Sequence, residues 1–172
     1  QWQQAAQYHR QALTIRTAHA QRREMAWSLQ NLADALRGLG DYETAVTYFE
    51  EAIALLDEVH DPVYRATVQM NLGIVYSIQG KSAKALELYS AAEGVFRRFT
   101  DGLNLAKVIT NQGLEYLGLR EWLQAEHAFT TGAELFLQFN NQGEYLNALD
   151  GLGISYLEQG RFTEALTIFT TI

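Results

Sequence analysis

The apolar residues of the chain fall on one face of a helix in segment after segment. Between about residues 22 and 39 they are spaced by three and four, at Met25, Leu29, Leu32 and Leu36. This spacing corresponds to one face at 3.6 residues per turn. The following segment carries the same spacing, at Tyr42, Ala45, Phe49, Ala52, Ile53 and Leu56. No stretch alternates apolar and polar residues over the length of a strand, so the pattern predicts an all-α protein.

The helical pattern recurs at a fixed step of 40 residues. A stretch that begins at Asn71 has counterparts that begin at Asn31, Asn111 and Gly151. Self-similarity at such a period is typical of stacked helical repeats. We expect a single array over residues 1–172, and we interpret it as a fragment of a longer protein because it begins and ends inside helical patterns. The predicted boundaries are a half repeat over 1–21, full repeats over 22–61, 62–101 and 102–141, and an incomplete repeat over 142–172.

Helix caps recur in phase with the apolar pattern. Asp41, Asp61, Asp101 and Asn141 are good N-caps, and Pro62 suits a first helical position. We therefore expect about nine helices, with consecutive helices antiparallel because their connections are short. From Pro62 onward the predicted helices cover about 62–79, 81–99, 102–119, 121–139, 142–159 and 161–172.

The repeated residues resemble those of the tetratricopeptide repeat (TPR) family, whose pattern is W-x2-L-G-x2-Y followed by A-x3-F. Two of the repeats match it closely, with Leu72, Gly73, Tyr76, Gly80, Ala85 and Tyr89, and with Leu152, Gly153, Tyr156, Gly160, Ala165 and Phe169. The resemblance covers the whole chain and implies a right-handed superhelical solenoid of antiparallel helix pairs. The period is 40 residues rather than the usual 34. Such long repeats resemble those of kinesin light chains, Pins-type polarity adaptors and MalT-like bacterial regulators.

The third repeat departs from this pattern. Gln112 replaces the expected Leu, and Arg120 replaces the expected Gly. A left-handed conformation at Arg120 would cost roughly 1–2 kcal/mol, and the alternative is that Gly118 ends the helix early. If Gln112 is buried without a partner, Gln112→Leu should stabilise the protein by about 1 kcal/mol.

Composition narrows the classes of partner. The formal net charge is -7, and no Lys/Arg-rich run is present, so neither nucleic acid nor a membrane is expected as the main partner. No apolar run approaches the roughly 18 residues that span a bilayer. The chain has no cysteine, which excludes disulfides and thiolate chemistry and fits the cytoplasmic location that we expect.

The sequence carries no catalytic or metal-binding pattern. The histidines are scattered without ligand spacing, at His9, His19, His60 and His127. His9 stands where other repeats carry Phe or Tyr, so a packing role is favoured over a metal ligand. The acidic cluster of Asp57, Glu58 and Asp61 fits helix capping and solvation. We therefore expect no enzyme activity, no cofactor and no metal site.

The resemblance implies that the first helix of each pair lines a concave groove for a protein or peptide partner. The residues it places there are Trp27, Asn31, Asp34, Arg37, Met70, Asn71, Ile74, Lys107, Asn111, Leu114, Leu117, Asp150 and Ile154. Gln30 and Thr67 fall on the same stripe.

Two interpretations of these groove residues stay open. The asparagines at 31, 71 and 111 could form a ladder that pairs with a peptide main chain, because an amide both donates and accepts. The alternative, equally weighted, is that asparagine is simply common at this place in the family consensus. Likewise Ile74, Leu114, Leu117 and Ile154 either form apolar pockets or pack against neighbouring helices.

We expect a protein-interaction scaffold that binds a peptide or protein segment in this groove. The alternative is a regulatory arm of a bacterial signalling protein or transcription regulator that senses a ligand or peptide. Self-association is also expected through the apolar terminal helices, around Trp2 and around Phe162 and Leu166.

Overall fold

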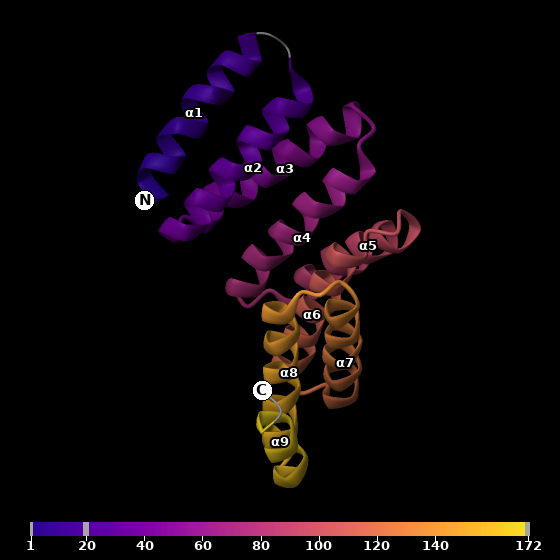
Figure 1. Cartoon of the computed structure of the whole chain (residues 1–172). Helices are drawn as coiled ribbons and strands as arrows, with labels where there is room; N and C mark the ends of the chain where they lie inside the picture. Colours follow the sequence, from indigo (N-terminus) through magenta and orange to yellow (C-terminus); the bar gives the residue numbers. More distant parts are fainter. Residues whose placement is uncertain (1, 19–20, 171–172) are drawn as a thin grey trace. The chain divides into compact units, whose positions relative to one another are not determined.

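The described residues form an all-α fold. The structure is a computed structural model that describes residues 2–18 and 21–170, and over these ranges it contains nine helices and no strand (Figure 1). The helices are α1 (Trp2–Ala18), α2 (Arg22–Leu39), α3 (Tyr42–Glu58), α4 (Pro62–Ile78), α5 (Ser82–Arg98), α6 (Gly102–Gly118), α7 (Trp122–Gln138), α8 (Gln142–Glu158) and α9 (Phe162–Phe169).

The predicted fold class is confirmed. From α4 to α8, each predicted helix end lies within one residue of the observed end. The last predicted helix reaches residues 171–172, which lie outside the described residues, as does His19. The repeat boundaries and the handedness of the array stay predictions.

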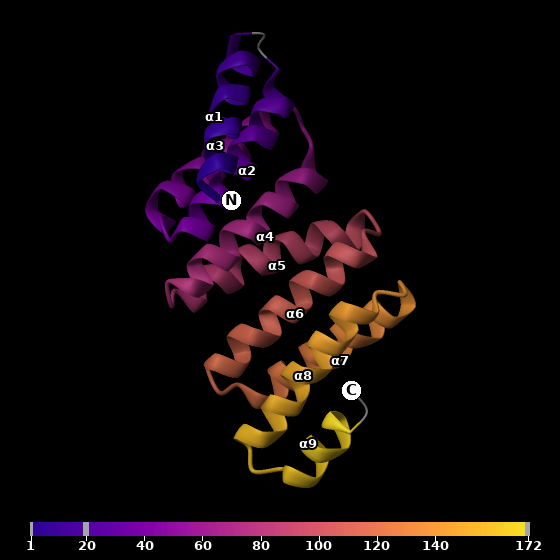
Figure 2. The ribbon, with the colours of Figure 1, turned by 60° about the vertical axis from the view of Figure 1, so that its left-hand side comes forward.

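Contacts divide the chain into two compact units, which we describe separately. Unit 1 is Gln1–Val95 and unit 2 is Phe96–Ile172, so the boundary falls inside α5. In unit 1, α2 packs between α1 and α3, and α4 packs on α3 and also touches α2. In unit 2, α7 packs between α6 and α8, α8 continues onto α9, and α6 touches α8 (Figures 1 and 2). We call α2, α4, α6 and α8 the first helices and the helix after each its second helix.

Small residues face large ones inside each unit. The alanine predicted on each second helix, at 45, 85, 125 or 165, is fully buried. In unit 2, the ring of Phe129 on α7 fills the space beside Gly113 on α6 and Gly151 on α8. A Cβ at either position would lie within 2.9 Å of that ring, so any residue other than glycine would clash with it. The glycines therefore permit the close approach of neighbouring helices.

All seven turns between α2 and α9 share one geometry. The N–H of the residue after the turn donates to the carbonyl five residues earlier, as from Asp41 to Leu36 at 2.9 Å. This is the Schellman motif, and it requires a left-handed residue just before that donor. Glycine fills the left-handed position at 40, 80 and 160. Non-glycine residues fill it at His60, Thr100, Arg120 and Asn140, with φ between 54° and 60°.

The predicted N-caps are confirmed, and of the two alternatives for the third repeat the structure shows the left-handed Arg120. Asp41, Asp61 and Asp101 each accept a hydrogen bond from the backbone N–H three residues on, and Asn141 does the same. Helix α6 is as long as its counterparts, and Arg120 takes the left-handed conformation with φ 60°. Gly118 therefore does not end the helix early.

Candidate functional site

The first helices of unit 1 present a polar surface between α2 and α4. Its members are Trp27, Gln30, Asp34 and Arg37, which follow one another by three or four residues along α2, and Tyr64 from the first turn of α4. We call this surface the α2–α4 face. The spacing places the four α2 side chains on one side of the helix, and Tyr64 of α4 lies near enough to Asp34 to feel its charge.

Asp34 is the central carboxylate of the α2–α4 face. Its Oδ1 lies 2.9 Å from Nη2 of Arg37, one turn further along α2, and it also accepts a hydrogen bond from the side-chain amide of Gln30. Burial raises the pKa of Asp34 above its usual 3.8, although Arg37 and Gln30 act in the opposite direction. The two partners therefore do not fully offset the cost of removing this charge from water.

Besides Oδ1 of Asp34, which has its ion pair with Arg37, two oxygen atoms of the α2–α4 face are buried without a hydrogen bond among the described residues. They are Oε1 of Gln30 and the hydroxyl of Tyr64. Burial raises the pKa of Tyr64 to about 12, with opposition from Arg23, whose guanidinium lies 5.6 Å from the ring centre. A buried polar atom without a partner costs about 1–3 kcal/mol, so both oxygens call for an explanation.

Trp27 forms the edge of the face toward α1. The Arg16 guanidinium lies 4.8 Å from the centre of the Trp27 ring, and His9 meets the ring edge-on at 5.5 Å. Burial and the nearby Arg16 lower the pKa of His9. Trp27 is still 47% exposed, so this large aromatic side chain remains open to a partner.

The side-chain amides of the asparagines are only partly available to a peptide main chain. The Asn31 amide donates to the backbone carbonyl of Trp27 at 2.7 Å, so one of its two N–H donors is already used within its own helix. Gly151 holds the corresponding place in the fourth repeat, and its Cα faces the Phe129 ring of the preceding second helix. Asn71 and Asn111 are half-buried. These observations favour packing at this position, and the ladder stays a prediction.

The remaining predicted groove residues differ in exposure. Met70 on α4 is only 6% exposed and belongs to the core, so it offers a partner little surface. Ile74, Lys107 and Leu117 are half-buried. Leu114 on α6 and Ile154 on α8 are exposed at 53% and 38%, and Asp150 is exposed as well. Unit 2 therefore presents an apolar first-helix surface where unit 1 presents a polar one.

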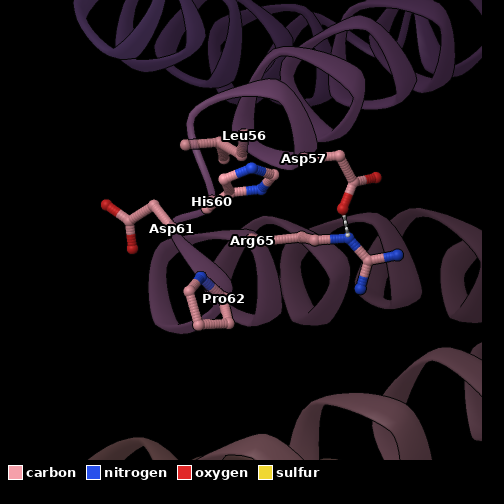
Figure 3. Close-up of a pocket in the computed structure, with 6 residues that line it drawn as sticks. All are labelled: Leu56, Asp57, His60, Asp61, Pro62 and Arg65. Carbon is pink, nitrogen blue, oxygen red and sulfur yellow. Dashed lines mark ion pairs between the residues drawn. The ribbon is translucent and has the colours of Figure 1, made fainter.

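A pocket of about 320 Å³ lies at the turn between α3 and α4 (Figure 3). Within it, Nε of Arg65 lies 2.7 Å from Oδ1 of Asp57, while the Asp61 carboxylate points away from this pair. Asp61 accepts hydrogen bonds from the backbone N–H of Tyr64 and from Arg23. These carboxylates are thus engaged in capping and ion pairs, which agrees with the sequence interpretation.

The sequence matches one family along most of its length. Tetratricopeptide repeat patterns match residues 1–58, and a further tetratricopeptide repeat pattern matches residues 31–100 and 110–171. The chain belongs to the TPR family. No curated protein matches the TPR chain in sequence.

Several solved structures share the TPR fold of this chain. TPR-like repeats described as those of a Podosopora anserina kinesin light chain have a TM-score of 0.81 at 17% identity, over 99% of this chain and 84% of that one. A Rap protein complexed with Competence and Sporulation Factor has a TM-score of 0.79 at 19% identity, over 86% of this chain and 42% of that one. Aspartyl phosphate phosphatase F from Bacillus subtilis has a TM-score of 0.77 at 16% identity, over 99% of this chain and 54% of that one. At these identities the likeness shows the fold alone.

A TPR fold is typically a non-catalytic interaction scaffold. Among the described residues, no group of three His, Asp or Glu side chains is placed to hold a metal ion. In the same part of the chain, no helix is long and apolar enough to cross a membrane.

Tyr64 is the residue of the α2–α4 face that the sequence analysis missed. The corresponding positions in the other repeats are Glu24, Asn104 and Glu144. Tyr64 is thus the only aromatic residue at this place, and that departure from the repeat pattern was a usable signal. A single sequence does not show that Tyr64 approaches α2, because this contact joins two different repeats.

Proposed function

We propose that this TPR chain is a protein-interaction scaffold whose first-helix surfaces bind an extended segment of a partner protein. The observation that carries the proposal is the pair of buried oxygens on the α2–α4 face, Gln30 Oε1 and the Tyr64 hydroxyl, which lack partners among the described residues. A bound segment would supply the missing hydrogen bonds and remove their cost.

The proposed binding residues combine the α2–α4 face with the predicted groove positions. In unit 1 they are Trp27, Gln30, Asn31, Asp34, Arg37, Tyr64, Asn71 and Ile74, with Met70 beneath them. In unit 2 they are Lys107, Asn111, Leu114, Leu117, Asp150 and Ile154. Exposed Leu114 and Ile154 would bury apolar side chains of the segment, at about 25 cal/mol per Å² of apolar area removed from water.

The alternative function, a sensing arm that binds a ligand or peptide, stays a prediction. The Rap protein bound to Competence and Sporulation Factor shares the fold with this chain, and no feature of the described residues favours sensing over scaffolding.

The proposal is tested by comparing co-purified partners of the full-length protein with those of two surface variants. The first variant combines Trp27→Ala and Tyr64→Phe on the α2–α4 face, and the control combines Glu50→Ala and Glu51→Ala, which are exposed on α3. We expect the first variant to lose the partner and the control to retain it, with circular dichroism showing that both are folded. Retention of every partner by the folded first variant would place binding elsewhere on the chain.

A captured partner then allows the asparagines to be tested one by one. Asn71→Ala should weaken binding about tenfold if its amide contributes near 1.4 kcal/mol, within the range of one hydrogen bond. Asn31→Ala should have a smaller effect, because one of its two N–H donors is bound to the Trp27 carbonyl. Equal affinities of all asparagine variants and wild type in calorimetric titrations would reject the ladder and leave the α2–α4 face to be judged by its own variants.

A further inference from the structure

The chemistry of the α2–α4 face identifies the kind of group that would bind there. The atoms without partners among the described residues are oxygens: Gln30 Oε1, which only accepts hydrogen bonds, and the Tyr64 hydroxyl, which accepts and donates. The Gln30 amide already donates to Asp34, so its carbonyl end is what remains. A ligand that completes this site must therefore bring donors.

The arginines around the face already have partners: Arg37 and Arg23 form ion pairs, and Arg16 has neutral hydrogen-bond acceptors. Arg37 is bound to Asp34, Arg23 to Asp61 at 2.8 Å, and Arg16 to the Ser28 hydroxyl and to the Glu24 carbonyl. An anionic ligand could use the remaining N–H donors of these guanidinium groups, but it would leave Gln30 Oε1 without a donor. The face is thus poorly suited to a carboxylate or a phosphate.

A primary ammonium meets the requirement better than a neutral amide does. It carries three donors on one compact nitrogen, and three acceptors are grouped here: Gln30 hydrogen-bonds Asp34, and Asp34 is near enough to Tyr64 to act on the pKa of its hydroxyl. A guanidinium prefers a carboxylate with both oxygens free, and one Asp34 oxygen is held by Arg37. The exposed Trp27 ring offers apolar surface for an aliphatic stem. The formal net charge of -7 also favours a cationic partner.

We propose that the α2–α4 face recognises a lysine side chain of the partner segment, with Gln30, Asp34 and Tyr64 accepting hydrogen bonds from its ammonium group. This inference rests on the proposed function and adds to it the residue type that the face selects. Burial has raised the pKa of Asp34. An added cation would therefore offset the part of the cost of burying this charge that Arg37 does not offset.

The test uses pools of nine-residue peptides with acetylated N-termini, amidated C-termini and random flanking residues. Four pools differ only in the fixed central residue: Lys, Nε-acetyl-Lys, Arg or Glu. Binding of each pool to the chain is measured by fluorescence anisotropy. We expect the Lys pool to bind at least tenfold more tightly than the Nε-acetyl-Lys pool, and more tightly than the Arg and Glu pools.

Two substitutions test whether the α2–α4 face causes the preference for Lys over Nε-acetyl-Lys. Tyr64→Phe and Asp34→Asn should each reduce the preference for Lys over Nε-acetyl-Lys by threefold or more, while circular dichroism and thermal melts report the fold. Asp34→Asn also frees Arg37, so binding of the Glu pool should rise. Glu158→Gln is the matched control, because it removes an exposed carboxylate from α8, a first helix of unit 2, outside the proposed binding residues, and should leave the preference unchanged.

The outcomes separate this inference from the proposed function. Equal binding of the Lys and Nε-acetyl-Lys pools, or tightest binding of the Glu or Arg pool, overturns the lysine proposal and leaves segment binding intact. A preference that falls equally in Glu158→Gln and Asp34→Asn reflects general charge and also overturns it. Binding of no pool at all by the folded chain overturns both proposals.

Discussion

The ring of Tyr89 on α5 occupies the space that a side chain at Gly73 on α4 would need. A Cβ at Gly73 would lie 2.5 Å from Cε1 of Tyr89, and Tyr89 is one of the largest fully buried side chains. This contact lies within unit 1 and couples the packing of α4 and α5 to the absence of a side chain at one position. Glycine is otherwise unfavourable inside a helix, so its presence here reflects close packing.

Gly73→Ala should therefore destabilise the protein. The added methyl group forces the Tyr89 ring to shift within a packed core, and overpacking of this kind costs about 1–3 kcal/mol. Gly94→Ala is the matched control, since Gly94 is an exposed helical glycine of α5 with no atom within 4 Å of an added Cβ. It should stabilise by about 0.5–1 kcal/mol through helix propensity. Urea melts measure both changes, and equal effects of the two variants would contradict the packing explanation.

The left-handed turn residues give a second pair of opposite expectations. Thr100 has φ 56° although its β-branched side chain disfavours that region, while Gly80 has φ 70° at the corresponding place of another turn. Thr100→Gly should stabilise by up to about 1 kcal/mol, reduced by the greater freedom of glycine in the unfolded chain. Gly80→Ala should destabilise by about 1 kcal/mol. If Thr100→Gly clearly lowers the melting temperature, the hydrogen bond from its hydroxyl to the Phe99 carbonyl outweighs the strain.

The sequence predicted the fold well because its signals are local and repeated. Helix periodicity, the N-caps at Asp41 and Asp61, and the small residues at Gly73 and Ala85 act within a helix or between consecutive helices. The same signals recur 40 residues further on, so each copy supports the others.

The candidate site was less accessible to sequence analysis because its contacts join separate repeats. Tyr64 meets the charges of α2 from the start of α4, and no local pattern marks that approach. Met70 was expected in the groove and is buried, because a stripe of positions along a helix does not say how far a neighbouring helix covers it. The back-bond from Asn31 to Trp27 is likewise invisible at the level of residue type.

For Gln112 the structure predicts the opposite of the expectation from the sequence, which was that Gln112→Leu stabilises the protein if Gln112 is buried without a partner. Gln112 on α6 is only 7% exposed and is not without a partner, so the condition for a stabilising Gln112→Leu substitution is not met. Leucine at this place should leave that partner unsatisfied and destabilise by about 1–3 kcal/mol. Chemical denaturation measures the change, and an unfolding free energy higher than that of wild type would restore the original expectation.

Helix α9 presents an apolar stripe that we expect to favour self-association. Phe162 and Leu166 are 69% and 64% exposed, and exposed apolar surface of this kind promotes contacts between molecules. Leu166→Glu should shift sedimentation at high protein concentration toward the monomer. Leu123→Glu, at an exposed leucine of α7, is the control and should not. Wild type that sediments as a monomer at all concentrations would rule out this association.

The raised pKa of Asp34 predicts how the stability difference between Asp34→Asn and wild type changes with pH. Because the folded pKa lies above the usual 3.8, the folded state takes up a proton before the unfolded state as the pH falls. The contribution of Asp34 to the unfolding free energy therefore rises as the pH is lowered through the raised pKa, and it is fully gained below 3.8. Asp34→Asn cannot titrate, so it gains nothing over this range.

The stability of Asp34→Asn relative to wild type should consequently be higher at pH 7 than at about pH 3.5. Urea melts of both proteins at the two pH values measure the difference, and taking it between proteins cancels the titration of groups that both share. Asp150→Asn serves as the control for removing a carboxylate from a first helix, since Asp150 is exposed on α8. A relative stability of Asp34→Asn that increases as the pH falls would mean that its pairing with Arg37 outweighs burial, and that the α2–α4 face already satisfies its own carboxylate.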